Sequence, residues 1–264
     1  MRFCRLMTDQ GPQWGGLEER DGELWVTHII TSPPEDRVLL HKGSFDAMPV
    51  AQVKLLAPVV PSKIVCVGRN YSDHARELGN EAPKEPLLFF KPPSAILDPG
   101  EPILRPAVSQ RVDFEGELGV IVGRQARDIA NDEDVAPYIR GYVCVNDVTA
   151  RDLQKTDGQW TRAKGFDTFC PVGPWVLDAE SLDPSSGVQL TTRVNGEVKQ
   201  GGSTAEMIFS VPTLLRYISG IFTLEPGDLI ATGTPAGVGP IVSGDVVEVE
   251  IAGLGVLRNP VKDR

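Results

Sequence analysis

Short apolar runs and alternating stretches, bounded by glycine and proline, dominate the hydrophobic pattern of this chain. Near the C-terminus, Val247, Val249 and Ile251 alternate with Glu248 and Glu250, the pattern of a strand that buries one face. Further strands are predicted over residues 64–67, 87–91 (as a buried strand), 142–147 and 229–232, and after a turn at residues 253–255. Short strands outnumber helices, so we expect a mainly β (α+β) fold and not a doubly wound α/β sheet.

Two segments carry helix patterns with start and stop signals. The clearer one begins at Ser210 and has Pro212 in its first turn. Its apolar stripe consists of Leu214, Leu215, Ile218 and Phe222. A shorter helix is predicted from Ser72, a favourable N-cap, to Gly79, a favourable residue just past a helix end. A further helical stretch is expected near residues 132–138.

The chain divides into a small β-rich domain over residues 1–60 and a larger domain over residues 61–264. Within the first part, Asp21-Gly22 is a hairpin-type turn, and Pro33-Pro34 marks a loop. Pro58 and Pro61 then punctuate the passage into the larger domain.

Three carboxylates, Asp113, Glu115 and Glu117, lie on a strand predicted over residues 113–122. Side chains two residues apart share one face of a strand, so these carboxylates face the same way. Like charges side by side on a sheet repel each other, and a hard cation such as Mg²⁺, Mn²⁺ or Ca²⁺ would remove that repulsion. The segment therefore predicts either a metal site or an exposed acidic strand edge.

Asp147 ends the strand predicted over residues 142–147 and would complete an acidic set with Glu115 and Glu117. Three carboxylates bind one divalent cation and leave positions open for water or substrate. Asp147 can also serve as the N-cap of a helix over residues 149–154, and the two roles are compatible.

Three other groups are candidates for chemistry. His74 and Glu77 face the same way on the predicted helix, either as a general base held by a carboxylate or as a surface pair. Lys164, in a predicted strand or loop, can bind a substrate carboxylate or an enolate oxygen, or be solvated. The glycine-rich segment 233–239 lacks the lysine of a P-loop but can offer backbone N–H groups and the Thr234 hydroxyl to a carboxylate.

Composition limits the partners and the compartment. With 26 basic against 36 acidic residues, the net charge is −10, which argues against nucleic acid or an anionic membrane as a partner. The four cysteines form no CxxC pair and are expected to be buried free thiols in a reducing cytoplasm. No apolar stretch reaches the ~18 residues of a membrane span, and the N-terminus has no signal-peptide core, so we expect a cytoplasmic protein.

Taken together, several motifs resemble the fumarylacetoacetate hydrolase family. In the family's order, they are Val67-Gly68-Arg69-Asn70-Tyr71 with His74 and Glu77, Phe90-Lys91-Pro92, Glu115-Gly116-Glu117-Leu118, residues 146–154, residues 163–167, residues 201–210 and Thr232-Gly233-Thr234-Pro235. The resemblance runs from about residue 62 to the C-terminus, and residues 1–60 resemble the small N-terminal domain of the shorter bacterial members. It implies a mixed β-sandwich roll, a catalytic domain over residues 61–264, and a homodimer.

The resemblance also implies roles for individual residues. The metal ligands, for Mg²⁺ or Mn²⁺ with Ca²⁺ as a substitute, would be Glu115, Glu117 and Asp147. The catalytic residues would be His74 and Glu77, which activate water on a short helix that orders as a lid, and Lys164. The residues that bind the substrate's 2-oxo-carboxylate end together with Lys164 would be Gln154 and Thr234, with Arg69 and Arg151 as further contributors.

The implied activity is metal-dependent chemistry on 2-oxo or 2-hydroxy-dienoic dicarboxylates through a metal-bound enolate. The first hypothesis is a 2-hydroxyhepta-2,4-diene-1,7-dioate isomerase or an acylpyruvate hydrolase of aromatic catabolism. The alternative on the same site is an oxaloacetate decarboxylase or tautomerase. A hypothesis of another class is a non-catalytic β-sandwich binding module with a structural cation, against which the pair His74 and Glu77 argues, because a binder needs no water-activating pair.

Overall fold

Strands make up most of the regular structure, as the hydrophobic pattern predicts. The computed structural model describes residues 1–31, 42–43 and 45–264. Its strands are β1 (Arg2–Thr8), β2 (Gly11–Arg20), β3 (Glu23–Ile30), β4 (Lys42–Gly43), β5 (Met48–Pro49), β6 (Lys54–Leu56), β7 (Ile64–Gly68), β8 (Leu87–Lys91), β9 (Ile96–Leu97), β10 (Ile103–Arg105), β11 (Val112–Phe114), β12 (Gly116–Val122), β13 (Ile139–Asn146), β14 (Thr149–Ala150), β15 (Cys170–Asp178), β16 (Gln189–Val194), β17 (Glu197–Ser203), β18 (Leu229–Ala231), β19 (Gly239–Pro240), β20 (Val246–Ile251) and β21 (Gly255–Asp263).

Helices are short and few in comparison. The α-helices are α1 (Ser72–Glu77), α2 (Arg151–Asp157), α3 (Thr161–Lys164) and α4 (Val211–Ser219). The 3₁₀ turns are η1 (Val50–Gln52), η2 (Pro93–Ala95), η3 (Ala136–Tyr138), η4 (Ala179–Ser181), η5 (Pro184–Ser186) and η6 (Thr204–Glu206). Within the described residues, no helix has the length and apolar character needed to cross a membrane.

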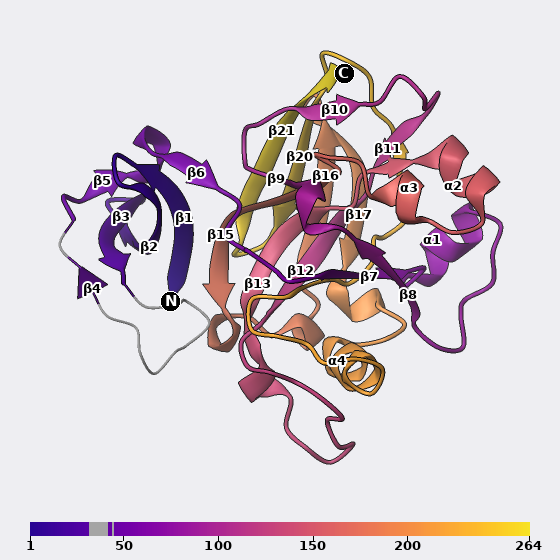
Figure 1. Ribbon diagram of the computed structural model, residues 1–264, viewed down its shortest axis with the longest axis horizontal. Coiled ribbons are helices and arrows are strands. Elements are labelled where there is room, and N and C mark those ends of the chain that lie inside the picture. Colours follow the sequence, from indigo (N-terminus) through magenta and orange to yellow (C-terminus); the bar gives the residue numbers. More distant parts are fainter. Residues whose placement is uncertain (32–41, 44) are drawn as a thin grey trace.

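The N-terminal strands β1–β6 lie together at one end of the molecule, at the left of Figure 1. Asp21 and Gly22 join β2 to β3 with positive φ angles of 50° and 81°, so the predicted hairpin turn is confirmed. The predicted loop at Pro33 and Pro34 lies outside the described residues. Because Arg2 of β1 pairs with Leu177 of β15, the N-terminal strands continue a sheet of the larger part of the chain. A domain division at residue 60 stays a prediction.

The sheets form a mixed sandwich, as expected. In the part of the chain that the structure describes, the largest sheet follows the order β4-β3-β2-β1-β15-β13-β12-β18-β7-β8, and a second one follows β10-β21-β20-β16-β17. Parallel pairs such as β7 with β18 and β10 with β21 occur beside antiparallel ones. The smaller sheet β14-β11-β19 lies next to α2 and α3 (Figure 1).

One buried cluster joins the two large sheets to α4. It includes Leu118 of β12, Leu190 of β16 and Val249 of β20, together with Leu214, Leu215 and Ile218 of α4. Phe222, the last residue of the predicted stripe, lies beyond the end of α4 and packs against the cluster partly buried. Helix α4 begins as the sequence predicts, because the Ser210 side chain accepts a hydrogen bond from the Thr213 N–H. Strand β20 alternates between buried and half-buried positions, which confirms the prediction for the C-terminal alternation.

Some local predictions were wrong or only partly right. Strand β8 was expected to be buried, but it is an edge strand with exposed Leu87 and Phe90, since β7 is its neighbour at the end of the sheet. The helical stretch expected near residues 132–138 is only the 3₁₀ turn η3. All four cysteines are buried free thiols, as expected.

Candidate active site

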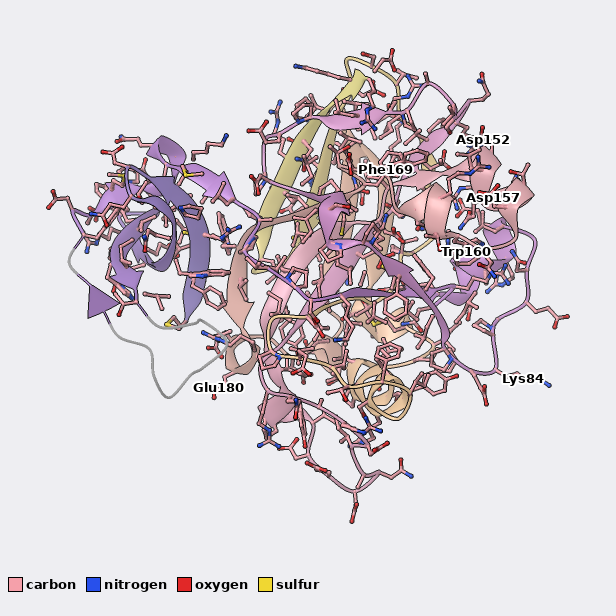
Figure 2. All side chains as sticks on the ribbon, viewed as in Figure 1. Lys84, Asp152, Asp157, Trp160, Phe169 and Glu180 are labelled. Atoms are coloured by element: carbon pink, nitrogen blue, oxygen red, sulfur yellow. The ribbon has the colours of Figure 1, made fainter. Side chains whose placement is uncertain are left out.

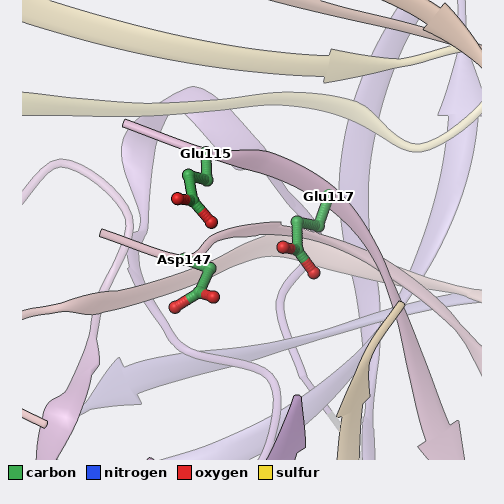
Figure 3. Close-up of side chains that lie close together, drawn as sticks. All are labelled: Glu115, Glu117 and Asp147. Atoms are coloured by element: carbon green, nitrogen blue, oxygen red, sulfur yellow. The ribbon is translucent and has the colours of Figure 1, made fainter. Parts of the chain in front are cut away.

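Glu115, Glu117 and Asp147 converge from two neighbouring strands. The antiparallel register of β12 and β13 pairs Gly116 with Asn146, which places residue 115 opposite residue 147. The Asp147 N–H donates to the Glu115 carbonyl over 2.8 Å, which locks the two segments together. One carboxylate oxygen from each of the three residues lies within 4.8 Å of the other two (Figure 3). The predicted convergence of these three side chains is therefore present in the structure.

Three details of the sequence prediction were wrong here. The strand predicted over residues 113–122 is interrupted at Glu115, because the Glu115 N–H donates to the Asn146 side chain instead of to a neighbouring strand. Asp113 accordingly does not join the acidic set and pairs with Arg111 and Arg151. Asp147 does not cap a helix either, since α2 begins at Arg151 with Ala150 as its N-cap.

The carboxylates are buried, so the alternative of an exposed acidic edge is wrong. Glu115, Glu117 and Asp147 are 4%, 2% and 1% exposed. Buried charges require partners, and two of the three carboxylates have them. The Lys164 Nζ lies 2.8 Å from Glu115 and 2.6 Å from Asp147.

Lys164 differs from its prediction in local structure and in surroundings. It ends the short helix α3 and does not lie in a strand or loop, and its side chain is buried between carboxylates and not solvated. It also lies 5.1 Å from the centre of the Phe89 ring. Its ammonium group thus faces both the acidic cluster and an aromatic wall.

Lys91 is a site residue to which the sequence reasoning gave no role. Its Nζ lies 2.7 Å from Asp147 Oδ1 and donates hydrogen bonds to the carbonyls of Val148, Lys164 and Phe169. A fully buried lysine with such partners fixes the backbone segments that carry Asp147 and Lys164. The signal for it was a lysine at the end of an apolar strand, immediately before Pro92-Pro93.

The two glutamates of the cluster have opposite electrostatic surroundings. Burial raises the pKa of Glu115, but the positive charges of Lys164 and Arg151 outweigh burial and hold that pKa below its usual value. Burial, and then the charges of Asp147 and Glu115, raise the pKa of Glu117 well above its usual value. Among the described residues, no cation lies within ion-pair distance of Glu117, which accepts one hydrogen bond from the Gly233 N–H.

This cluster fits a hard divalent cation. Oxygen ligands lie at about 2.0–2.6 Å from Mg²⁺ or Ca²⁺, so two oxygens on one ion are at most about 4–5 Å apart, as they are here. Asp147 Oδ1 lies close to Lys91 but accepts no hydrogen bond in good geometry. A cation at this place would provide the positive charge that Glu117 lacks.

His74 and Glu77 lie together on α1, as predicted. The His74 Nδ1 lies 3.2 Å from Glu77, and His74 is buried, so the pair is not an ordinary surface pair. The Gly237 N–H donates to both oxygens of Glu77, which fixes the carboxylate against the glycine-rich loop. Helix α1 ends at Glu77, and Gly79, with φ 71°, lies just past its C-cap, as expected, but the N-cap is Tyr71 and not Ser72. That α1 orders as a lid stays a prediction.

The glycine-rich segment positions carboxylates of the protein itself. It was expected to offer its N–H groups to a carboxylate, and the N–H groups of Gly233 and Gly237 bind Glu117 and Glu77. The Thr234 hydroxyl donates to the Gly116 carbonyl and accepts from Gln200. These bonds hold the segment against β12.

One cavity of about 240 Å³ brings the predicted residues together. The predicted residues that line it are Arg69, His74, Glu115, Glu117, Asp147, Arg151, Gln154, Lys164 and Thr234. Glu77 supports His74 and does not line the cavity. Val67 and Gly68, which belong to the motif that contains Arg69, also line the cavity, although the sequence reasoning assigned them no role. The sequence reasoning missed Leu78, Asn80, Phe89, Lys155 and Trp160, because single apolar or surface residues carry no motif.

The comparisons with known proteins agree with this geometry. The sequence profile described as "Fumarylacetoacetate (FAA) hydrolase C-terminal" matches residues 63–262. The chain belongs to the fumarylacetoacetate hydrolase family. Members of this family are enzymes, and the mainly β fold with several sheets is the fold of the family.

Relatives of the chain in this family include proteins with named activities. The chain is 53% identical over 264 residues to Protein Rv2993c of Mycobacterium tuberculosis, with 99% of this chain and 98% of that protein covered. It is 42% identical over 258 residues to oxaloacetate tautomerase YisK of Bacillus subtilis, with 91% and 84% covered. The solved structure of 2-hydroxyhepta-2,4-diene-1,7-dioate isomerase from Mycobacterium marinum matches with a TM-score of 0.88 and 43% identity, covering 100% of this chain and 99% of that one.

Proposed function

We propose that this chain is a divalent-metal-dependent isomerase of 2-oxo and 2-hydroxy-dienoic dicarboxylates, of the 2-hydroxyhepta-2,4-diene-1,7-dioate type. The observation that carries the proposal is the buried set Glu115, Glu117 and Asp147 at a cavity that His74 also lines. The similarity to the isomerase from Mycobacterium marinum supports the choice of reaction.

Glu115, Glu117 and Asp147 would hold the cation, with Mg²⁺ or Mn²⁺ expected from their oxygen ligands. When bound, such a cation acts as a Lewis acid that stabilises negative charge on a carbonyl oxygen. Lys164 adds a fixed positive charge beside the same carboxylates. Gln154 and Arg151, joined by a hydrogen bond of 2.7 Å, line the cavity and provide polar groups for the substrate's carboxylate.

His74 is the proposed acid and base of the isomerisation. Glu77 occupies Nδ1, so the other ring nitrogen can take a proton from one substrate position and return it to another. An isomerisation breaks one C–H or O–H bond and forms another, and it consumes no water. Leu78, Phe89 and Trp160 give the same cavity an apolar wall.

The assay for this proposal follows the ultraviolet absorbance of 2-hydroxyhepta-2,4-diene-1,7-dioate with Mg²⁺ and with excess chelator. We expect conversion that depends on the cation. His74→Gln is expected to lower the rate by about 10²–10⁴-fold without changing cation binding, because it removes the proton carrier. The matched control on the same helix is Asp73→Asn, which changes an exposed carboxylate and should keep the rate. An unchanged rate in His74→Gln would exclude the proposed base.

The second candidate is oxaloacetate tautomerisation on the same site, which the similarity to YisK favours. Enol and keto oxaloacetate interconvert by the same proton transfer at a 2-oxo acid. Parallel assays with enol oxaloacetate and with acetylpyruvate separate tautomerisation, decarboxylation and C–C hydrolysis by their products. If none of these substrates is consumed, a binding module becomes the better interpretation. A homodimer without nucleic-acid or membrane partners, located in the cytoplasm, stays a prediction.

A further inference from the structure

Two cations at the cavity, Arg69 and Lys155, take no part in the carboxylate cluster. The other lysine and arginine that line the cavity, Lys164 and Arg151, are bound to Glu115. In contrast, the described residues place no carboxylate within ion-pair distance of Arg69 or Lys155. Positive groups that line a cavity and have no carboxylate partner attract an anionic ligand.

Arg69 is held in place by its surroundings. Its φ of 59° lies in the left-handed region, which a non-glycine residue adopts at a cost and which recurs at functional sites. The next residue, Asn70, fixes this backbone, because its side chain binds the backbone of Phe209 and Thr232. The Arg69 guanidinium lies 5.9 Å from the centre of the Trp160 ring.

Trp160 is fixed in turn, so that Arg69 rests on a rigid surface. The rings of Trp160 and Phe89 meet edge to face, with centroids 5.1 Å apart. Trp160 also packs against Gly68, where a Cβ atom would lie 2.9 Å from the indole ring. Figure 2 shows Trp160 beside the helices that border the cavity. A cation stacked on a rigid aromatic ring loses little conformational freedom when it binds an anion.

The charged groups that line the cavity differ in how deeply they are buried. Glu115, Glu117 and Asp147 are buried, Arg69 is half-buried, and Lys155 is exposed. Lys155 follows Gln154 directly on α2, so the same helix lines the cavity with a polar amide and a cation. The cavity therefore has an inner end suited to a metal and a 2-oxo acid, an apolar wall, and a positive outer end.

We propose that Arg69 and Lys155 bind the second, distal carboxylate of the substrate and make the cavity selective for 2-oxo dicarboxylates over 2-oxo monocarboxylates. This inference rests on the proposed function, because that function places the 2-oxo end at the carboxylate cluster. It assigns Arg69 to the distal end and not to the 2-oxo end, and it adds Lys155 as a specificity-determining residue.

The test is calorimetric binding of three 2-oxo acids to the Mg²⁺-loaded protein. Pyruvate has one carboxylate, whereas 2-oxoglutarate and 2-oxoadipate carry a second one at two different spacings. The wild-type protein is expected to bind at least one dicarboxylate about tenfold more tightly than pyruvate, because a charge-assisted hydrogen bond to the second carboxylate contributes about that gain in affinity. Lys155→Gln and Arg69→Gln should each weaken dicarboxylate binding about tenfold and change pyruvate binding less than about twofold.

Arg162→Gln is the matched control. Arg162 lies on the neighbouring helix α3, does not line the cavity, and pairs with Asp157, so its replacement removes the same charge at the surface. It should leave all three affinities unchanged. If Lys155→Gln and Arg69→Gln lost as much affinity for pyruvate as for the dicarboxylates, or lost no affinity for any of the acids, the inference alone would be overturned. A wild-type protein that binds none of the three acids would overturn the proposed function and the inference together.

Discussion

Strands β12 and β20 show what surroundings do to the same spacing of glutamates. Glu115 and Glu117 are two residues apart where β12 begins, and Glu248 and Glu250 are two residues apart on β20. On β20, the side chains are 26% and 42% exposed and pair across strands with Arg258 and Arg193. Such exposed pairs are worth little and are screened by salt.

At β12, the same spacing points into the protein next to a third carboxylate. Burial strengthens every charge interaction there, so the cluster requires cations from the protein or from solution. The protein provides Lys164, Lys91 and Arg151, but none of these lies within ion-pair distance of Glu117. The same Glu-x-Glu spacing therefore gives exposed, salt-bridged side chains on β20. At β12, where burial and the third carboxylate of Asp147 are added, it gives a cluster that fits a cation.

The largest effect on stability is expected from Glu115→Ala. The substitution removes the buried carboxylate that pairs with Arg151 and Lys164, so the free energy of unfolding should fall by about 3 kcal/mol. Denaturant titration of the cation-free protein measures this change. A loss below about 1 kcal/mol would mean that the ion pairs of Glu115 contribute no more to the free energy of unfolding than the exposed pairs of β20.

A divalent cation should stabilise the protein through the β12 cluster only. At a free Mg²⁺ or Mn²⁺ concentration 100 times the dissociation constant, the free energy of unfolding should rise by about 2.7 kcal/mol. Thermal unfolding with and without chelator measures the gain. The double variant Glu248→Gln/Glu250→Gln should keep the full gain, and its loss in that variant would mean that the cation binds at β20.

The smallest effect is expected from Glu250→Gln. Its pair with Arg193 is partly exposed, so the free energy of unfolding should change by less than about 1 kcal/mol, and by less still at high salt. Denaturant titration at two salt concentrations checks both statements. A loss that matches that of Glu115→Ala would remove the contrast between the two strands.

Much of this arrangement could be predicted from the sequence, because the motifs carry their own periodicity. The i, i+2 spacing of Glu115 and Glu117 and the i, i+3 spacing of His74 and Glu77 place each pair on one face of an element. The alternation on β20 and the helix start at Ser210 likewise predicted local structure correctly.

The remaining features depend on contacts between distant segments. Asp113 obeys the same alternation as Glu115, but the strand is interrupted at Glu115, and Asp113 pairs with Arg111 and Arg151 outside the acidic set. Lys91 lies in the motif Phe90-Lys91-Pro92, but the motif does not show its role, because its partners, Asp147 and backbone carbonyls, are far away in the sequence. The apolar run of β8 is typical of a buried strand, and only the position of β8 at the sheet edge explains why Phe90 is exposed.

Titration of the chelator-treated protein with Mn²⁺, for wild type and for Glu117→Gln, tests the central claim most directly. Glu117 takes part in no ion pair among the described residues, so its replacement should change cation binding without weakening the fold. Even outer-shell partners contribute about 10–100-fold to metal affinity, so loss of a ligand should cost more than about 100-fold. We expect one tight ion per wild-type chain and this loss in the variant. Wild-type affinity in Glu117→Gln, or no Mn²⁺ bound to the wild type, would contradict the account.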